Sequence, residues 1–248
     1  MRISFTSVAA PELSIEEMID FAAEVGYDAI ELRCDYPEDP HAHGVSAGHR
    51  EVAPTTSTER DAIVDRLERT GVDICLLGTS CAFAHADPDR RTANEDEAIE
   101  YASLAASLGV PFVRVFGGAL PEELTWEEGR DHIVASLERV CAGAAEHDVS
   151  IMFEQHDEWD EADVLVDIVT AVDADNLGIL WHLTQEQAPL ETMDAHLKHL
   201  HVREYGLFMA DLVALLDEQG YDGYLSYERG TGEESLRDFH ATVRPMLS

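Results

Sequence analysis

The feature that most constrains the fold of this chain is a regular alternation of short apolar runs with longer amphipathic stretches along its 248 residues. Runs rich in β-branched and other apolar residues predict strands at 2–5, 28–33, 72–78, 111–116, 149–154, 176–181, 199–203 and 223–228. The stretches between them have helical periodicity, and such alternation predicts a parallel sheet with right-handed crossovers. Eight units in a chain of this length fit a single (β/α)₈ TIM barrel over residues 1–248 better than an open doubly wound sheet.

Local signals support this division. Glycine precedes the next strand by one to three residues at Gly26, Gly71, Gly109 and Gly220, where it is typical of a helix C-terminus. Helix N-caps are predicted at Ser14, Ser57 and Asp160. The first strand–helix turn, TSVAAPELS, lacks the GxGxxG pattern of dinucleotide-binding folds, which favours the barrel further.

Polar side chains inside the predicted strands are the next constraint. Barrel strands are covered on both faces, so they are expected to be almost continuously apolar, and a charged residue in one of them needs a partner. Because the outward face packs under helices, these side chains are predicted to point into the barrel. They are Glu31, Arg33, Arg114, Glu154, His182, His199, His201, Arg203 and Glu228. Most lie at the carboxyl ends of their strands, where barrel enzymes hold their sites.

Four of these side chains come from consecutive strands and are expected to meet at one side of the barrel mouth: Glu154, His182, His201 and Glu228. Two carboxylates and two imidazoles suit one divalent ion such as Mn²⁺, Zn²⁺, Co²⁺ or Fe²⁺, and a cation removes the repulsion between the glutamates. Such an ion polarises the carbonyl of a hydroxy-carbonyl compound, and the glutamates can then move a proton between carbons through an enediolate. The alternative is that Glu154 and Glu228 are buried carboxylates paired with arginines.

Several motifs resemble the xylose isomerase-like TIM-barrel superfamily, which includes sugar and sugar phosphate isomerases and epimerases, 3-dehydroshikimate dehydratases and apurinic endonucleases. The similar segments are GYDAIELR (26–33), IMFEQHD (151–157), NLGILWH (176–182), KHLHVRE (198–204) and GYDGYLSYER (220–229). The resemblance extends over essentially the whole chain. It implies that Glu154, His182, His201 and Glu228 are the metal ligands and that Glu154 and Glu228 are the catalytic acid/base pair.

Two positions depart from the pattern of that superfamily. Where it commonly has Asp-x-x-His, this chain has His182 and Gln185. A neutral imidazole leaves two formal negative charges around the ion, which favours Zn²⁺, Fe²⁺ or Co²⁺ over Mg²⁺, and Gln185 cannot shuttle a proton. In addition, HVREYG runs almost directly into the next predicted helix, so the long substrate loop usual after that strand is missing.

Substrate contacts are expected around the same mouth. The long, His-rich segment CDYPEDPHAHGVSAGHR (34–50) is either a cover over the mouth or a solvated surface loop. Arginines at the strand ends either bind a carboxylate or phosphate or balance the inward glutamates. The predicted substrate-binding residues are Glu31, Arg33, His43, His49, Arg114, His156, Gln185 and Arg203. His199 is expected one layer deeper as a core histidine, and Trp159 and Trp181 are expected to pack in the core.

Composition limits the possible partners. Asp and Glu number 51 against 16 Lys and Arg, for a net charge of -35. This charge disfavours nucleic acid and membrane, and its even spread resembles proteins of halophiles, adapted to molar salt. Four cysteines without CxxC spacing predict buried reduced thiols. No signal segment or membrane-length apolar stretch is found, so a cytoplasmic protein is expected.

These observations predict a divalent-metal-dependent isomerase or epimerase acting on a small sugar, sugar phosphate or related hydroxy-carbonyl compound in carbohydrate metabolism. A dehydratase or lyase shares the first proton abstraction and is the nearest alternative. The alternative that is not an enzyme is a catalytically silent relative that binds a sugar or metabolite. A homodimer is possible. The apurinic-endonuclease function is disfavoured, because it needs more metal ligands and a surface that tolerates DNA.

Overall fold

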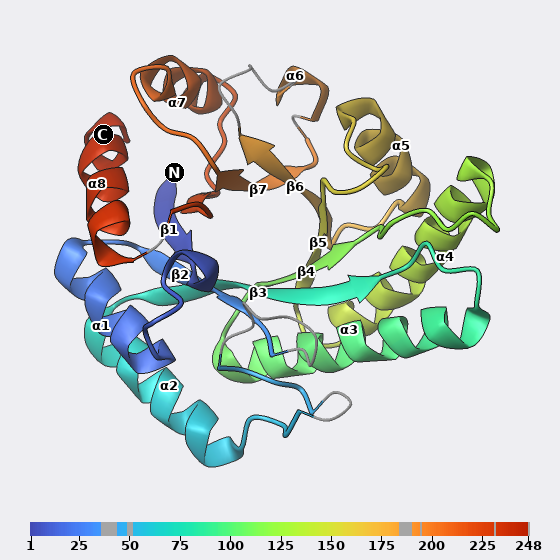
Figure 1. Ribbon diagram of the computed structural model, residues 1–248, viewed down its shortest axis with the longest axis horizontal. Coiled ribbons are helices and arrows are strands. Elements are labelled where there is room, and N and C mark those ends of the chain that lie inside the picture. Colours follow the sequence, from blue (N-terminus) through green and yellow to red (C-terminus); the bar gives the residue numbers. More distant parts are fainter. Residues whose placement is uncertain (36–43, 49–51, 184–189, 194, 231, 248) are drawn as a thin grey trace.

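Eight parallel strands close into a barrel in the computed structural model, which describes residues 1–35, 44–48, 52–183, 190–193, 195–230 and 232–247. Each strand pairs with its neighbours in chain order, and the first pairs with the last to complete the ring. Helices follow the strands and form an outer layer around them (Figure 1). The predicted (β/α)₈ TIM barrel is therefore confirmed.

The strands lie where the apolar runs predicted them, with small differences at their ends. They are β1 Arg2–Thr6, β2 Ala29–Arg33, β3 Asp73–Ala82, β4 Phe112–Phe116, β5 Ser150–Glu154, β6 Leu177–Leu183, β7 Leu197–Val202 and β8 Tyr224–Tyr227. The largest difference is β3, which runs four residues beyond the predicted end at Gly78. Its pairing with β4 shifts register between Gly78 and Ala82. Because this segment is irregular, the sequence pattern used to predict strands does not extend to the true end of β3.

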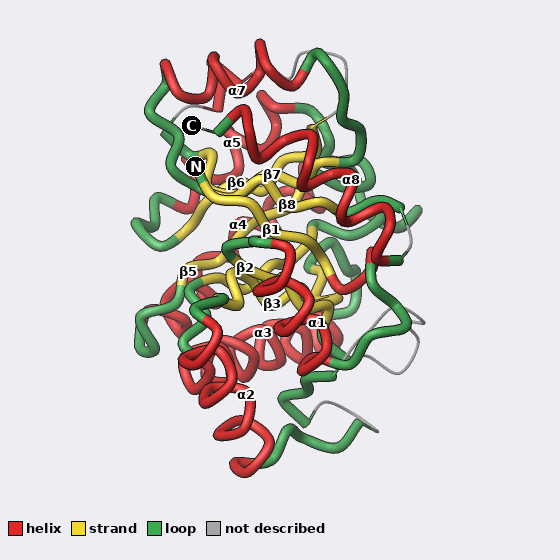
Figure 2. Tube along the Cα trace, turned by 90° about the vertical axis from the view of Figure 1, so that its left-hand side faces the viewer, coloured by secondary structure: helices red, strands yellow, loops and turns green. Residues whose placement is uncertain are grey.

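The helices of the described chain are α1 Ile15–Val25, α2 Ser57–Thr70, α3 Pro88–Leu108, α4 Trp126–Ala145, α5 Ala162–Val172, α6 Leu190–Met193, α7 Met209–Glu218 and α8 Glu233–Val243. Short 3₁₀ turns lie at Ser7–Ala9 and Arg244–Met246. None of these helices is long and apolar enough to cross a bilayer. The two termini lie near each other, beside β1 and α8, in both Figure 1 and Figure 2.

Helix ends follow the expected chemistry, with two corrections. Ser14 caps α1 in a reciprocal capping box with Glu17, as predicted. The prediction of Ser57 as the cap of α2 is wrong by one residue, because Thr56 accepts from the Glu59 backbone and Ser57 is already helical. Asp160 is likewise one residue early, since α5 begins after Glu161.

The predicted helix-terminal glycines all have left-handed backbone conformations. Gly26, Gly71 and Gly109 are the C-caps of α1, α2 and α3, with φ between 71° and 100°. Gly220 lies one residue beyond the C-cap of α7 and has φ 73°. A side chain at such positions is strained, which explains why glycine ends these helices before the next strand begins.

The core has two layers that place the site. The larger lies between the barrel and its helices and includes Trp159 and Trp181, so their predicted packing role is confirmed. The smaller fills the barrel interior with Cys75, Leu76, Met152, Leu180 and Tyr224. Glu154 and His182 lie two residues beyond Met152 and Leu180 on the same strands, so the apolar interior forms a floor beneath the mouth.

All four cysteines, Cys34, Cys75, Cys81 and Cys141, are buried and free, as predicted. Burial raises the pKa of the Cys141 thiol to about 12. These thiols therefore stay protonated and act as small apolar side chains of the core.

Candidate metal centre at the barrel mouth

Four potential ligands converge at the carboxyl ends of β5 to β8. They are Glu154, His182, His201 and Glu228, and each offers one ligand atom within 4.8 Å of the others. Glu154, His182 and His201 are buried, and the Glu228 side chain is 12% exposed. The structure thus brings together the four side chains that the sequence predicts as one set.

The strand register explains this convergence. His182 lies opposite His201 in the pairing of β6 with β7, and the two rings stack with centroids 5.4 Å apart. Glu154 is the last residue of β5, and Glu228 directly follows β8. The Glu228 backbone N–H donates to the Val202 carbonyl at 3.1 Å, which continues the β7–β8 ladder and fixes where the carboxylate begins.

The two carboxylates divide their oxygens between arginines and the centre. Oε2 of Glu154 accepts from Arg114, and Oε2 of Glu228 accepts from Arg203 Nε at 2.7 Å. Oε1 of Glu154 lies 2.5 Å from Nε2 of His182 and 3.4 Å from Nδ1 of His201. Oε1 of Glu228 lies 3.3 Å from the same Nδ1. Oε1 of each glutamate therefore lies nearest an imidazole nitrogen, while Oε2 of each accepts from an arginine; Oε2 of Glu228 also lies 3.9 Å from Nε2 of His182.

Both glutamates are held ionised. Burial by itself would raise the pKa of Glu154, but the Arg114 guanidinium, the hydrogen bond to His182 and the nearby His201 ring lower it well below its usual value. Burial also opposes the charge of Glu228, and the neighbouring Glu154 carboxylate does so too. The protonated His201 ring, and after it the neighbouring His182 and Arg203 side chains, nevertheless lower the pKa of Glu228.

The two histidines differ in charge. Burial lowers the pKa of His182 despite its hydrogen bond to Glu154, so this ring is neutral. Burial acts on His201 in the same direction, but the carboxylates of Glu31 and Glu228 outweigh it and raise its pKa well above the usual value. The centre thus stabilises one additional positive charge between two carboxylates.

A divalent cation fits these donors. Nδ1 of His201 is buried and has no hydrogen-bond partner in the described part of the chain, although two carboxylate oxygens lie near it. Two imidazole nitrogens and two carboxylate oxygens form a mixed set suited to Zn²⁺, Mn²⁺, Co²⁺ or Fe²⁺. The site is therefore a candidate metal centre with Glu154, His182, His201 and Glu228 as ligands.

Arg114 is built into the barrel beside this centre. Its backbone carbonyl accepts from Thr79 Oγ1 at 2.7 Å, and its guanidinium lies over the Phe116 ring, 4.0 Å from the centroid. A Cβ at Gly78 would come within 2.8 Å of the guanidinium, so glycine at this position makes room for it. Arg114, predicted as a substrate contact or a counter-charge, has the geometry of a counter-charge to Glu154.

The other predicted substrate residues are dispersed. Arg33 is half-buried at the end of β2, and His156 lies on the rim, with its ring 4.8 Å from the Phe116 ring. Glu31 lies inside the barrel and bonds to protein groups. His43, His49 and Gln185 lie outside the described residues. Substrate binding by these residues remains a prediction.

Two contributors to the site were not predicted. The Gln155 side chain accepts from the His182 backbone N–H at 3.1 Å and donates to the Asp160 carbonyl at 2.9 Å. Ser226 points into the barrel and donates to Glu31 at 2.9 Å. Its inward position on β8 follows from the same alternation that places Glu228, but a small polar residue in a strand is too common to single out.

His199 and Cys75 lie deeper, with Glu31 between them and the mouth. Nε2 of His199 is 3.1 Å from Glu31, and the Cys75 thiol donates to the Ile30 carbonyl at 3.4 Å. Burial lowers the pKa of His199, so it is a neutral core histidine, in agreement with its prediction.

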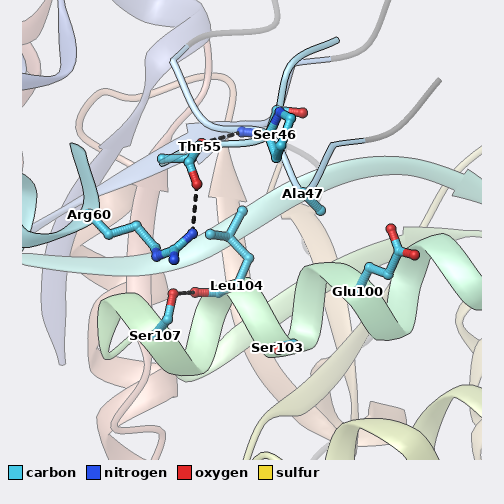
Figure 3. Close-up of a pocket in the computed structure, with 9 residues that line it drawn as sticks. Ser46, Ala47, Thr55, Arg60, Glu100, Ser103, Leu104 and Ser107 are labelled. Atoms are coloured by element: carbon cyan, nitrogen blue, oxygen red, sulfur yellow. Dashed lines mark hydrogen bonds between the residues drawn. The ribbon is translucent and has the colours of Figure 1, made fainter. Parts of the chain in front are cut away.

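A separate surface pocket of about 270 Å³ lies between the segment after β2 and helices α2 and α3 (Figure 3). Its lining includes no member of the metal cluster. Arg60 donates to the Thr55 carbonyl at 2.6 Å, and Ser107 donates to the Leu104 carbonyl at 2.7 Å. These side chains are engaged in local structure, and the titratable cluster lies elsewhere, so the barrel mouth is the better candidate for function.

Comparison with solved structures finds the same architecture in sugar-converting proteins. The chain resembles 3-keto-D-glucoside 4-epimerase (YcjR) from E. coli, with a TM-score of 0.79, 17% identity and 99% of each chain covered. It resembles D-psicose 3-epimerase from Clostridium cellulolyticum H10, with a TM-score of 0.74, 16% identity and coverage of 100% of this chain and 94% of that one. A third similar structure, the IolI protein with a bound zinc atom, has a TM-score of 0.74 and 16% identity, with 99% and 96% covered.

No curated protein sequence matches the chain significantly. The model of one family, described as xylose isomerase-like TIM barrel, matches residues 19–244. That range includes seven of the eight strands and all four candidate metal ligands. The chain therefore belongs to the xylose isomerase-like TIM barrel family.

Proposed function

We propose that this protein is a divalent-metal-dependent isomerase or epimerase of a small, uncharged hydroxy-carbonyl sugar. The observation that carries the proposal is the division of the glutamate oxygens. One oxygen each of Glu154 and Glu228 faces His182 and His201, and the other is held by an arginine. Arg114 and Arg203 therefore balance the two carboxylates, and the remaining carboxylate oxygens and imidazole nitrogens can bind a cation.

A bound divalent ion would polarise the substrate carbonyl and make the hydrogen on the neighbouring carbon more acidic. Glu228, the more exposed of the two glutamates, would remove that proton as a general base and leave an enediolate. Return of a proton to the opposite face of the same carbon gives an epimer, and return to the adjacent carbon gives an isomer. For the isomer, Glu228 would return the proton that it removed. For the epimer, Glu154, on the other side of the centre, would take up a proton from solvent and donate it, while Glu228 would release its own proton to solvent.

The arginines support an uncharged substrate. Arg114 is buried against Glu154, and Arg203 already balances the charge of Glu228, so neither guanidinium brings a surplus positive charge to the mouth for a phosphate or carboxylate. Structures similar to this chain include epimerases named for psicose and for a keto-glucoside. Both names describe uncharged sugars, which agrees with this substrate class.

The same glutamate–arginine pairs favour a second candidate, a sugar-binding protein without turnover. Because Arg114 and Arg203 already balance Glu154 and Glu228, the site is electrostatically stable without an ion. His182, in place of the more usual aspartate, lowers the negative charge available to hold a metal.

Elemental analysis and a substrate screen separate these candidates. We expect about one equivalent of Zn²⁺, Mn²⁺, Co²⁺ or Fe²⁺ per chain, and turnover of free ketoses or keto-glycosides in preference to their phosphorylated forms. Glu228→Gln should lower kcat by roughly 10²–10⁴-fold. Glu204→Gln is the matched control, since Glu204 lies near the mouth on the exposed surface and pairs only weakly with Arg229 at 3.8 Å.

Each result has a distinct meaning. Metal with turnover that is lost in Glu228→Gln and kept in Glu204→Gln supports the enzyme. Saturable sugar binding without turnover supports the binding protein. Purified protein that takes up no ion after incubation with each of the four metals rules out the metalloenzyme.

A further inference from the structure

Glu31 joins three strands across the inside of the barrel. Its carboxylate accepts from Nε2 of His201 at 2.9 Å, from Nε2 of His199 at 3.1 Å and from Oγ of Ser226 at 2.9 Å. All four side chains are buried. Glu31 itself comes from β2, whereas its partners come from β7 and β8 on another part of the ring.

The geometry of these bonds determines which nitrogen of His201 faces the mouth. Three donors converge on Glu31, and an ionised carboxylate accepts but does not donate. Nε2 of His201 must therefore carry the hydrogen in this bond. The other nitrogen, Nδ1, is directed at the Oε1 atoms of Glu154 and Glu228, 3.4 and 3.3 Å away, and has no hydrogen-bond partner in the described chain.

We propose that Glu31 is a positioning residue that fixes His201 so that it binds the metal ion through Nδ1. This inference rests on the proposed metal-dependent function, and it identifies Glu31 as the residue that orients the ligand His201. A carboxylate bonded to the far nitrogen of a ligating histidine holds the ring in one orientation and one tautomer, and it makes the ligating nitrogen more basic.

Glu31 is itself held firmly enough to serve this purpose. The pairing of β2 with β3 shifts register between Ile30 and Glu31, and such irregularities re-aim a side chain. His199 on β7 and Ser226 on β8 then bond to the carboxylate from across the barrel. His201 Nε2 lies within hydrogen-bond distance of both oxygens, at 2.9 and 3.1 Å, which restricts rotation of the ring.

Glu31→Gln tests the role with little change in volume. The glutamine has one accepting oxygen and an amide group that only donates, so it cannot accept from all three partners. We expect the affinity for Zn²⁺, measured by calorimetric titration, to fall roughly 10- to 100-fold. Glu97→Gln is the matched control, because Glu97 is also a buried glutamate but belongs to α3, outside this network.

Nitrogen NMR of the zinc-loaded wild-type protein with labelled histidine provides a readout that does not depend on the variants. The expected spectrum shows His201 with zinc on Nδ1 and a hydrogen on Nε2. Zinc on Nε2 would overturn the inference, and so would an equal loss of affinity in the Glu31 and Glu97 variants or no loss in either. If Glu31→Gln does not fold, the wild-type spectrum alone decides.

The outcomes also separate this inference from the proposed function. A wild-type protein that binds no metal contradicts both. A wild-type protein that binds zinc and turns over a sugar, but whose affinity is unchanged by Glu31→Gln, contradicts only the role of Glu31.

Discussion

At the scale of single residues, His182 decides the charge of the centre. The His182 side chain is buried and bonded to Glu154 at 2.5 Å. Members of the xylose isomerase-like superfamily commonly have an aspartate at this position. We expect His182→Asp to add a third negative charge and to shift metal preference from Zn²⁺ toward Mn²⁺ and Mg²⁺. Competition titrations of the wild type and variant with pairs of these ions measure the change in preference.

His182→Ala is the control for this substitution, because it removes a ligand without adding charge. It should weaken binding of all three ions and leave their order unchanged. A His182→Asp protein with the same order of affinities as the wild type would show that His182 does not contribute to the coordination sphere.

His85 gives a residue-level prediction for pH. Burial, with help from Arg90 and Arg91, lowers the pKa of this half-buried histidine to about 4. The unfolded chain therefore binds a proton near pH 6.5 that the folded protein does not accept, so this contribution to stability is complete above pH 6.5 and is lost as the pH falls toward 4. Urea unfolding at pH 7 and pH 5 should show that the free energy of unfolding falls more between these pH values for the wild type than for His85→Asn.

The comparison isolates the ring because its backbone contacts persist in the variant. The His85 N–H donates to the Phe83 carbonyl, and the His85 carbonyl accepts from Arg91. Carboxylates titrate in both proteins and cancel in the difference. Parallel pH curves would show that the imidazole has no part in acid destabilisation.

At the scale of secondary structure elements, the start of α2 offers a direct contrast between neighbours. Thr56 accepts from the Glu59 N–H at 3.3 Å, and Glu59 bonds back to the Thr56 N–H at 2.7 Å. Thr56→Ala should therefore cost about 1 kcal/mol of unfolding free energy. Ser57→Ala, one residue into the helix, should change it by less than about 0.5 kcal/mol, since alanine has the higher helix propensity. Chemical denaturation of both variants measures the difference, and equal losses would refute the assignment of the cap.

The contrast at α2 also shows how far the sequence alone predicts this molecule. The alternation of apolar runs with amphipathic stretches identifies all eight strands. Charged residues inside these strands are expected to point inward, because the outward face is buried under helices. The order of the strands then brings Glu154, His182, His201 and Glu228 together. One-residue choices such as Thr56 over Ser57 depend on the actual helix path. Contacts across the barrel, such as Glu31 with His201, join residues 170 positions apart and depend on ring closure and strand register.

At the scale of the whole molecule, the high negative charge is a property that the barrel fold does not explain. Acidic residues outnumber Lys and Arg by 51 to 16, for a net charge of -35, so ion pairs such as Arg237 with Glu24 cannot give every carboxylate a basic partner of its own. Exposed pairs contribute little to stability, so repulsion among carboxylates is expected to dominate the surface electrostatics. Composition therefore predicts that the stability of the protein rises with salt concentration.

We expect the Tm to rise as KCl is increased from 0.1 M to about 1 M, because the screening length falls from about 10 Å to about 3 Å over this range. Replacement of three exposed acids, Asp61, Glu68 and Glu138, by lysine should raise the Tm at low salt and reduce its rise with salt. Salt effects on apolar burial are the same in both proteins, so the difference between the two slopes reports repulsion alone. A Tm that falls with KCl, or equal slopes in the two proteins, would mean that the acidic surface does not limit stability.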